Sequence, residues 1–411
     1  FRGAFADEDL GIEVQRHHIR GEQRWVLALR DLAESERLQV VATNGVCYAT
    51  QKGRGVQDIF TCLRKKTNLD EAGSLLSCNA QRFVKSSKEM AYLFQDMREA
   101  VSNTFRVAER CEFSLENIGY EFPRFPVPKG ESMDSFLKKI VWFGAEQRYG
   151  SLSLAVKRQL RHELDVIGKL EFSGYFLIVW DLVNYCREHN IMAQGRGSAA
   201  NSAVCYSLGI TPVDPVGGGL LFERFLNEER RSWPDIDIDL PSGSRREQVI
   251  QEVYRRYGRH GAAMTANVIT YRGRSAVREI GKVLGFAEET LGRFSSLYES
   301  HNYSHEISIE EQFENSEIPV AHPRAAAFAR LFPRIVGLPR HLGQHSGGMI
   351  ICQGELDSLV PLEPASMPGR TVVQWDKEDC EDMGMVKVDL LGLGMMAVMQ
   401  DAFEAVRAKG R

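Results

Sequence analysis

Residues 234–239 read Pro-Asp-Ile-Asp-Ile-Asp, and this alternation constrains the fold more than any other feature of the sequence. Successive side chains of a β-strand point to opposite faces, so Asp235, Asp237 and Asp239 would project from one face. Three carboxylates so close together repel one another unless a counter-charge is present. The segment therefore predicts a strand that holds divalent cations such as Mg²⁺, with a solvated, acidic edge strand as the alternative.

Two other segments carry groups that suit the same chemistry. Residues 385–390 alternate again and place Lys387 and Asp389 on one strand face, which offers a third carboxylate and an ammonium group for a phosphate. The turn at 194–198 contains Gly195, Arg196, Gly197 and Ser198 and precedes a predicted helix of small residues over 199–208. Glycines and a helix N-terminus favour phosphate binding. An ordinary alternating strand and a plain strand–turn–helix connection are the alternatives.

Length and composition indicate a multidomain globular protein. The chain has 411 residues, 43% of them hydrophobic and 26% charged, which predicts two or three domains. No apolar run is long enough to cross a bilayer, and the first residues lack the pattern of a signal peptide. The eight cysteines are scattered without a CxxC pair, which predicts reduced, structural thiols and a cytoplasmic location. The absence of an initiator Met predicts a piece of a longer protein.

The chain has a net charge of −4, but the charge is uneven, and residues 224–282 form a basic stretch. A basic field within a near-neutral chain is typical of a groove that binds a polyanion, although solvated helix faces would give the same pattern. The candidate DNA-binding residues are Arg245, Arg246, Arg255, Arg256, Arg272 and Arg274.

The order of predicted elements suggests a mixed α/β chain. Strands are expected over 38–43, 191–193, 235–240, 348–352, 371–374 and 385–390, and helices over 56–64, 87–100, 135–148, 154–170, 174–189 and 245–257. Three prolines within residues 120–130 predict a domain boundary, and residues 267–340 are expected to be mainly helical. His341 and His345 are four residues apart, as zinc ligands can be, but the nearby glycines favour a loop without zinc.

Taken together, these motifs resemble the bacterial DNA polymerase III alpha-subunit family, or family C. The resemblance rests on residues 174–177, 194–202, 221–227 and 234–239, followed by 345–348 and 387–393. Residues 194–206, 265–272 and 374–377 look closest to the error-prone branch, with a replicative alpha subunit as the alternative. The family implies a palm of the polymerase-beta-like nucleotidyltransferase type with an inserted helical thumb, preceded by part of a polymerase-and-histidinol-phosphatase (PHP) barrel.

The resemblance also implies roles for individual residues. Asp235, Asp237 and Asp389 match the catalytic carboxylates, which would hold two Mg²⁺ ions, or Mn²⁺ in their place. Residues that match phosphate-binding or nucleotide-binding positions are Gly195, Arg196, Gly197, Ser198, Arg224, Arg230 and Lys387. The implied partners are primer-template DNA, deoxynucleoside triphosphates and, in a longer parent, a sliding clamp and mutagenesis accessory proteins, with no membrane.

The domain boundaries implied by the family are 1–116 for the end of the PHP-like domain, 117–266 for the first part of the palm, 267–341 for the thumb and 342–411 for the second part of the palm and the start of the fingers. Gly45 and Cys47 stand where the family commonly has an Asp and a His, so no phosphoesterase metal centre is expected. The start of the PHP domain and most of the fingers are expected to be missing. A fragment that binds primer-template without catalysis is therefore an alternative to an active polymerase.

Overall fold

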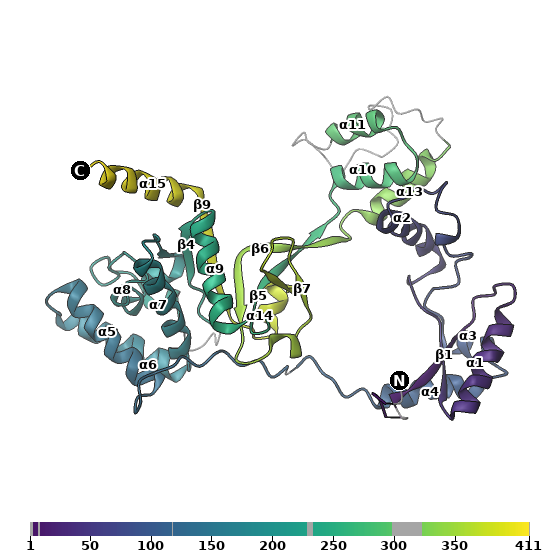
Figure 1. Cartoon of the computed structure of the whole chain (residues 1–411), viewed down its shortest axis with the longest axis horizontal. Helices are drawn as coiled ribbons and strands as arrows, with labels where there is room; N and C mark the ends of the chain where they lie inside the picture. Colours follow the sequence, from purple (N-terminus) through teal and green to yellow (C-terminus); the bar gives the residue numbers. More distant parts are fainter. Residues whose placement is uncertain (1–2, 7–8, 117, 228–232, 298–322, 411) are drawn as a thin grey trace. The chain divides into compact units, whose positions relative to one another are not determined.

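A computed structural model describes residues 3–6, 9–116, 118–227, 233–297 and 323–410. The chain divides into two compact units, one of residues 1–113 and 270–340 and the other of residues 114–269 and 341–411. Each unit thus combines segments that are far apart in the sequence (Figure 1). No helix in the described part of the chain is long and apolar enough to cross a membrane.

The first unit contains a small parallel sheet of β1 (Gly11–Gln15) and β2 (Gln39–Thr43). Its helices are α1 (Glu22–Glu36), α2 (Arg54–Lys65), α3 (Ser87–Leu93), α4 (Arg98–Glu109), α10 (Gly273–Val283), α11 (Glu288–Leu297) and α13 (Ala325–Ile335). The helix expected over 87–100 is therefore interrupted. An apolar cluster that includes Ile59, Ile280 and Phe328 joins α2 to α10 and α13.

The second unit is built on a seven-stranded sheet with the order β3-β4-β9-β6-β5-β8-β7. The strands are β3 (Gln194–Arg196), β4 (Asp237–Pro241), β5 (Ala262–Thr270), β6 (Pro339–Ile351), β7 (Leu362–Pro364), β8 (Thr371–Asp376) and β9 (Lys387–Leu393). Within this sheet β4 and β9 are parallel neighbours, and β3 and β6 flank them in antiparallel pairings. The hydrogen bonds between β4 and β9 join residues that are more than 100 positions apart in the chain.

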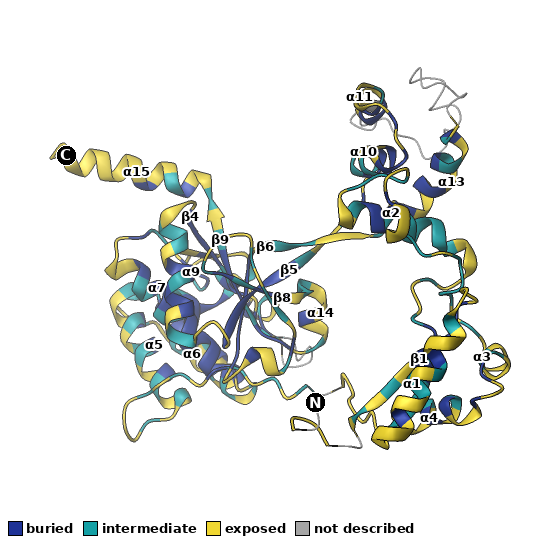
Figure 2. Cartoon of the chain, turned by 45° about the vertical axis from the view of Figure 1, so that its right-hand side comes forward, coloured by how far each residue is buried: buried dark blue, intermediate teal, exposed yellow. Residues whose placement is uncertain are grey.

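Helices cover the β3–β4 end of this sheet (Figure 1). The helices of the unit are α5 (Met133–Tyr149), α6 (Leu154–Lys169), α7 (Ser173–Glu188), α8 (Ala203–Ser207), α9 (Ser244–Tyr257), α14 (Lys377–Asp382) and α15 (Gly394–Ala408). Ile236, Ile238 and Leu240 lie in the core beneath β4 and are at most 1% exposed. Figure 2 shows that burial is concentrated along the central strands and the inner helix faces, whereas α15 is largely exposed.

Two sequence predictions were wrong. Residues 191–193 are not a strand, because pairing with β4 begins only at Gln194. Residues 341–347 are not a loop but part of β6, which continues to Ile351. The segment 267–340, expected to be mainly helical, contains α10, α11 and α13, although β5 extends into it as far as Thr270 and β6 begins within it at Pro339. Pairing with neighbouring strands outweighs the local preference of the glycines in β6.

Candidate metal and phosphate site

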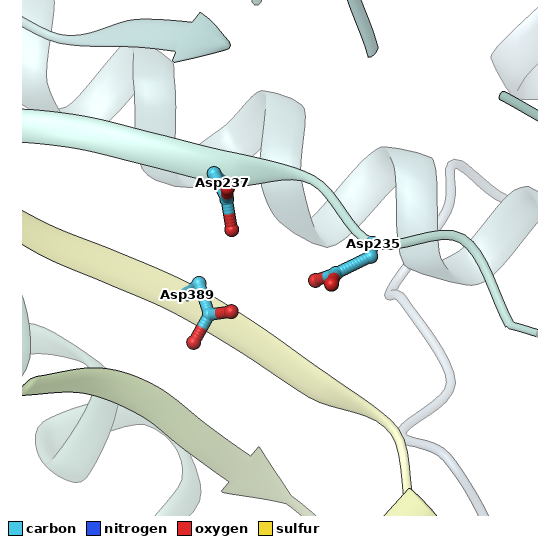
Figure 3. A group of neighbouring side chains, drawn as sticks. All are labelled: Asp235, Asp237 and Asp389. Carbon is cyan, nitrogen blue, oxygen red and sulfur yellow. The ribbon is translucent and has the colours of Figure 1, made fainter. Parts of the chain in front are cut away.

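Asp235, Asp237 and Asp389 come together at the junction of β4 and β9. Asp237 and Asp389 are direct neighbours in the parallel register, and Asp235 lies two residues before Asp237, just ahead of the strand. One carboxylate oxygen from each residue lies within 4.8 Å of those of the other two. Figure 3 shows the three carboxylates directed into a common space. In the described part of the chain, this is the only such group of three acidic, His or Cys ligands.

Asp239 shares the strand face but has a different partner. The Nε of Arg196 lies 3.3 Å from Asp239 Oδ1 and 3.6 Å from Asp237 Oδ2. Burial raises the pKa of Asp239, and the charge of Arg196 partly opposes that shift. Arg196 on β3 therefore neutralises the inner end of the acidic row, while Asp235 and Asp237 face Asp389.

Lys387 supplies the counter-charge for the other end of the row. Its Nζ donates hydrogen bonds to Asp235 Oδ1 at 2.5 Å and to Asp389 Oδ2 at 2.6 Å. Burial by itself would lower the pKa of Lys387, but the two hydrogen bonds and carboxylate charges outweigh it and raise that pKa. The side chain of Lys387 is only 11% exposed, so its ammonium group is held close to the carboxylates.

The protein's own cations offset the remaining acidity of the site only in part. Burial, followed by the charges of Asp235 and Asp389, raises the pKa of Asp237. Asp389 Oδ1 is buried and accepts no hydrogen bond from the described residues. Burying a carboxylate oxygen that accepts no hydrogen bond is unfavourable, and coordination of a hard divalent cation by that oxygen would remove the cost. The three aspartates therefore fit a Mg²⁺ or Mn²⁺ site.

The predicted phosphate-binding turn lies beside these carboxylates. Gly197 opens the short 3₁₀ helix η4 (Gly197–Asn201) with a φ of +70°, a conformation that favours glycine. A Cβ atom at Gly197 would lie 4.0 Å from Asp237 Oδ2, which shows how near the turn is to the aspartates. A Cβ at Gly195 would lie 2.9 Å from the carbonyl oxygen of Ile210, so that position has no room for a side chain.

The structure distributes the remaining predicted nucleotide-binding residues unevenly. Arg224 is exposed on η5 (Phe222–Arg224), which packs against η4. Ser198 is half-buried in η4, next to Gly197. Arg230 lies outside the described residues.

All four predicted DNA-binding arginines on α9 have intramolecular partners. Arg245 pairs with Asp401 and Glu404 at 2.7 and 2.9 Å. Arg255 and Arg256 both contact the buried carboxylate of Glu252, and Arg256 also pairs with Asp181. Arg246 donates to the backbone carbonyls of Leu390 and Ser346. Their contribution to DNA binding stays a prediction.

Arg272 and Arg274 belong to the other unit. They line a cleft of about 500 Å³ beside α10, together with Arg278, Lys282 and Arg340. Their contact with DNA also stays a prediction.

Two clefts include in their lining either one of the aspartates or residues that contact them. The larger, of about 770 Å³, includes Arg196, Arg246, His345 and Arg370 in its lining. The smaller, of about 230 Å³, is lined by Asp235 itself, together with residues that include Trp233, Lys377 and Lys387.

His345 closes one side of the site. Its Nδ1 accepts a hydrogen bond from the Gly348 N–H at 2.7 Å and lies 3.9 Å from Asp389 Oδ1. Burial lowers the pKa of His345, and the negative charge of Asp389 only partly opposes that shift. His341, four residues earlier and not expected to form a zinc site with His345, is exposed on the same strand.

Two residues that support the site were missed by sequence reasoning. The hydroxyl of Tyr175 on α7 accepts a hydrogen bond from the Ile236 N–H, between Asp235 and Asp237. Glu163 is fully buried on α6, at a helical spacing from Val156, Leu160 and Ile167 that would normally carry an apolar residue. An acidic residue on a core-facing helical stripe was the available signal.

Comparison with known proteins assigns a family to this arrangement. The family model described as "Bacterial DNA polymerase III alpha NTPase domain" matches residues 135–392. The "Error-prone DNA polymerase" of Bradyrhizobium diazoefficiens is 42% identical over 389 residues, covering 94% of this chain and 34% of that protein. The protein of the same name from Nocardia farcinica is 42% identical over 405 residues, covering 98% of this chain and 34% of that protein.

These relatives support the family assignment and show how much of a full-length relative this chain covers. The "Error-prone DNA polymerase 3" of Agrobacterium fabrum is also similar, at 41% identity over 380 residues, covering 92% of this chain and 35% of that protein. The chain spans about a third of the length of the curated relatives it matches. The expected resemblance, including its error-prone branch, is confirmed. The chain belongs to the bacterial DNA polymerase III alpha family.

Proposed function

We propose that this chain provides the catalytic palm of an error-prone DNA-directed DNA polymerase. The observation that carries the proposal is the convergence of Asp235, Asp237 and Asp389 from neighbouring parallel strands, beside the Gly197 turn. Nucleotidyl transfer requires a site that positions a triphosphate and a primer 3′-hydroxyl and tolerates the charge that develops between them. The named error-prone function of the relatives supports the same proposal.

In this proposal the aspartates hold two Mg²⁺ ions, with Mn²⁺ as a substitute. When bound, the ions would assist loss of the primer hydroxyl proton and stabilise the charge on the pyrophosphate leaving group. Asp389 and Asp237 are fixed by adjacent strands, so their separation is set by the sheet and not by mobile loops. Such preorganisation removes a reorganisation cost from the reaction.

The protein's own cations and turn would orient the substrates. The backbone at Gly197 and Ser198 would approach the triphosphate, and Arg224 on the neighbouring η5 would add positive charge. Lys387 neutralises Asp235 and Asp389 in the absence of ligands and would turn toward a phosphate oxygen when cations occupy the carboxylates. Primer 3′-hydroxyl attack on the α-phosphate would then form the new phosphodiester bond and release pyrophosphate.

The larger cleft is the proposed entry for a nucleic-acid backbone. It reaches the site at Arg196 and His345 and carries the guanidinium group of Arg246, whereas Arg370 in its lining is paired with Glu247. Positive charge along a cleft favours a polyphosphate chain. We assign the sheet unit to the palm and the segment 270–340 to the thumb. Residues 1–113 are assigned to the end of the PHP-like domain, and the fingers, clamp contacts and accessory partners to the longer parent protein.

Calorimetric titration tests the proposal. The chain is titrated with Mn²⁺ and then with dATP, beside a double variant Asp235→Asn/Asp237→Asn that keeps side-chain volume while removing two charges. We expect metal-dependent nucleotide binding in the parent chain and its loss in the variant. Equal nucleotide binding by both proteins would show that the aspartates are not the site. Metal binding without nucleotide binding would favour the non-catalytic alternative for this chain.

A further inference from the structure

Glu163 is an unusual residue in the second unit because its carboxylate is completely buried and forms no ion pair with the described residues. It lies on α6, whose neighbouring core positions Val156, Leu160 and Ile167 are apolar. Removing a carboxylate from water is unfavourable unless hydrogen bonds replace the lost hydration. A buried acid that the proposed reaction does not use therefore calls for a structural or positional explanation.

Four donors surround the Glu163 carboxylate. Oε1 accepts hydrogen bonds from the Ala203 N–H at 2.9 Å and from Gln159 Nε2 at 3.0 Å. Oε2 accepts from the Ser202 hydroxyl at 2.7 Å and from the Val204 N–H at 3.0 Å. Two of these donors are backbone groups at the first turn of α8, where N–H groups have no partner within the helix. Glu163 thus caps α8 from a different helix.

The capped segment continues directly into the phosphate turn. Ser202 follows η4, and its N–H donates to the Ala199 carbonyl within that turn at 3.1 Å. The Asn201 side chain donates to the Ser198 carbonyl at 2.9 Å. Ala199, Ser202 and Ala203 are all buried, so the C-terminal end of η4 is enclosed while Gly197 is exposed at its other end.

We infer that Glu163 is a positioning residue for the triphosphate: it anchors Ser202, Ala203 and Val204 so that the turn at Gly197 and Ser198 is held beside the aspartates. The inference rests on the proposed function and adds to it a residue that contacts neither substrate nor metal. It acts through hydrogen bonds to the turn and not through its charge at the reacting atoms. Loss of the anchor should therefore affect the nucleotide more than the metal.

Glu163→Gln is the sharpest variant because it preserves size. A carboxylate offers an acceptor on each side, whereas an amide offers one acceptor and one donor group. Ala203 and Val204 donate to different oxygens of Glu163. In either orientation of the new amide, its NH₂ group would therefore face one of these two backbone N–H groups. Asp165→Asn is the matched control, since it makes the same chemical change at an exposed position of α6. Ser202→Ala is a second variant: it removes the hydroxyl that donates to Glu163 and accepts from the Cys205 N–H, and it leaves both backbone hydrogen bonds to Glu163 in place.

The experiment measures Mn²⁺ binding alone and dATP binding at saturating Mn²⁺ by calorimetry, for the parent chain and the three variants. Hydrogen exchange of residues 197–207 is followed on the same samples. We expect Glu163→Gln to bind Mn²⁺ within about two-fold of the parent but dATP about ten-fold more weakly. Exchange should accelerate in the turn and in α8, with a smaller effect for Ser202→Ala and none for Asp165→Asn.

The outcomes separate the inference from the proposal beneath it. If the parent chain binds dATP and Glu163→Gln binds it equally well, Glu163 does not position the turn and only the inference falls. If Glu163→Gln loses Mn²⁺ and dATP together and exchange accelerates throughout the second unit, Glu163 is a general stability residue and the inference is again wrong. If the parent chain binds Mn²⁺ but no dATP, the proposed nucleotide site itself fails, and the inference fails with it.

Discussion

Lys387 Nζ lies 2.5 Å from Asp235 Oδ1, and this ion pair joins residues that are 152 positions apart in the sequence. The same ammonium group lies 2.6 Å from Asp389 Oδ2. It therefore offsets the charge of both carboxylates in the free protein. In the proposed metal site, Lys387 would compete with a divalent cation for them.

Replacing Lys387 with Met should separate these two effects. Removal of one partner from a largely buried ion pair leaves uncompensated charge, so the free energy of unfolding without metal should fall by about 1–3 kcal/mol. Mn²⁺ affinity in the absence of nucleotide should rise several-fold, because no ammonium group has to be displaced. Urea unfolding and calorimetry measure the two quantities.

Lys377→Met is the matched control for Lys387→Met. Lys377 lines the same small cleft but forms no ion pair with the described residues. Its replacement should leave the free energy of unfolding within about 0.5 kcal/mol of the parent value. Weaker Mn²⁺ binding by Lys387→Met would contradict the expectation and would show that the ammonium group supports the cation site.

Asp237→Asn should stabilise the metal-free protein at neutral pH. The folded-state pKa of Asp237 is raised above its usual value of 3.8, so its ionisation costs stability. The protonated form of Asp237 therefore makes a favourable contribution to the free energy of unfolding. This contribution is fully present below pH 3.8 and is lost as the pH rises through the raised pKa. The variant, which cannot ionise, should be more stable than the parent by up to about 1 kcal/mol after allowance for solvent screening.

The difference in free energy of unfolding between Asp237→Asn and the parent should shrink as the pH falls through the raised pKa. With Mn²⁺ present, the parent should become the more stable of the two proteins. The parent gains stability from metal binding by mass action, whereas the variant has lost one ligand. Thermal unfolding across pH, with and without Mn²⁺, tests both statements. A variant that is less stable than the parent without metal at neutral pH would contradict the assigned charge repulsion.

Tyr175→Phe should weaken the metal site through the backbone. The change removes only the hydroxyl that accepts the Ile236 N–H at 3.0 Å, and it leaves a buried donor without a partner. We expect a loss of about 1–3 kcal/mol of stability and weaker Mn²⁺ binding. Tyr185→Phe is the control, because the Tyr185 hydroxyl accepts its hydrogen bond from the exposed amide of Gln248. Equal effects of the two changes on Mn²⁺ affinity would refute a specific role for Tyr175.

Replacing Arg255 and Arg256 with Ala should weaken duplex DNA binding and flatten its salt dependence, since each lost phosphate contact lowers the salt slope by about 1. The double change also strips both partners from the buried carboxylate of Glu252. Arg255→Ala alone is therefore the cleaner variant, because its side chain is 70% exposed and Arg256 still neutralises Glu252. An unchanged salt slope in binding measured from low to high salt would show that these arginines serve only the intramolecular ion pairs.

The sequence by itself determined the local features of the site. The period-two alternation at 235–240 placed the aspartates opposite the buried Ile236, Ile238 and Leu240. The same alternation identified the strand that contains Lys387 and Asp389, and the glycines at 195 and 197 identified a turn where side chains do not fit or φ is positive. These properties depend on neighbours within a few residues, which is why a single sequence reveals them.

Only the tertiary structure decided which of these features meet. The register that sets Asp237 against Asp389 arises from hydrogen bonds between distant strands, and no local pattern specifies it. The partners of charged side chains follow from the tertiary contacts: Arg196 faces Asp237 and Asp239, whereas Arg245 pairs with Asp401 of α15 and Arg256 with Asp181 of α7. The role of Glu163 likewise depends on α6 packing against the start of α8, so the energy of a buried charge is set by its three-dimensional neighbours.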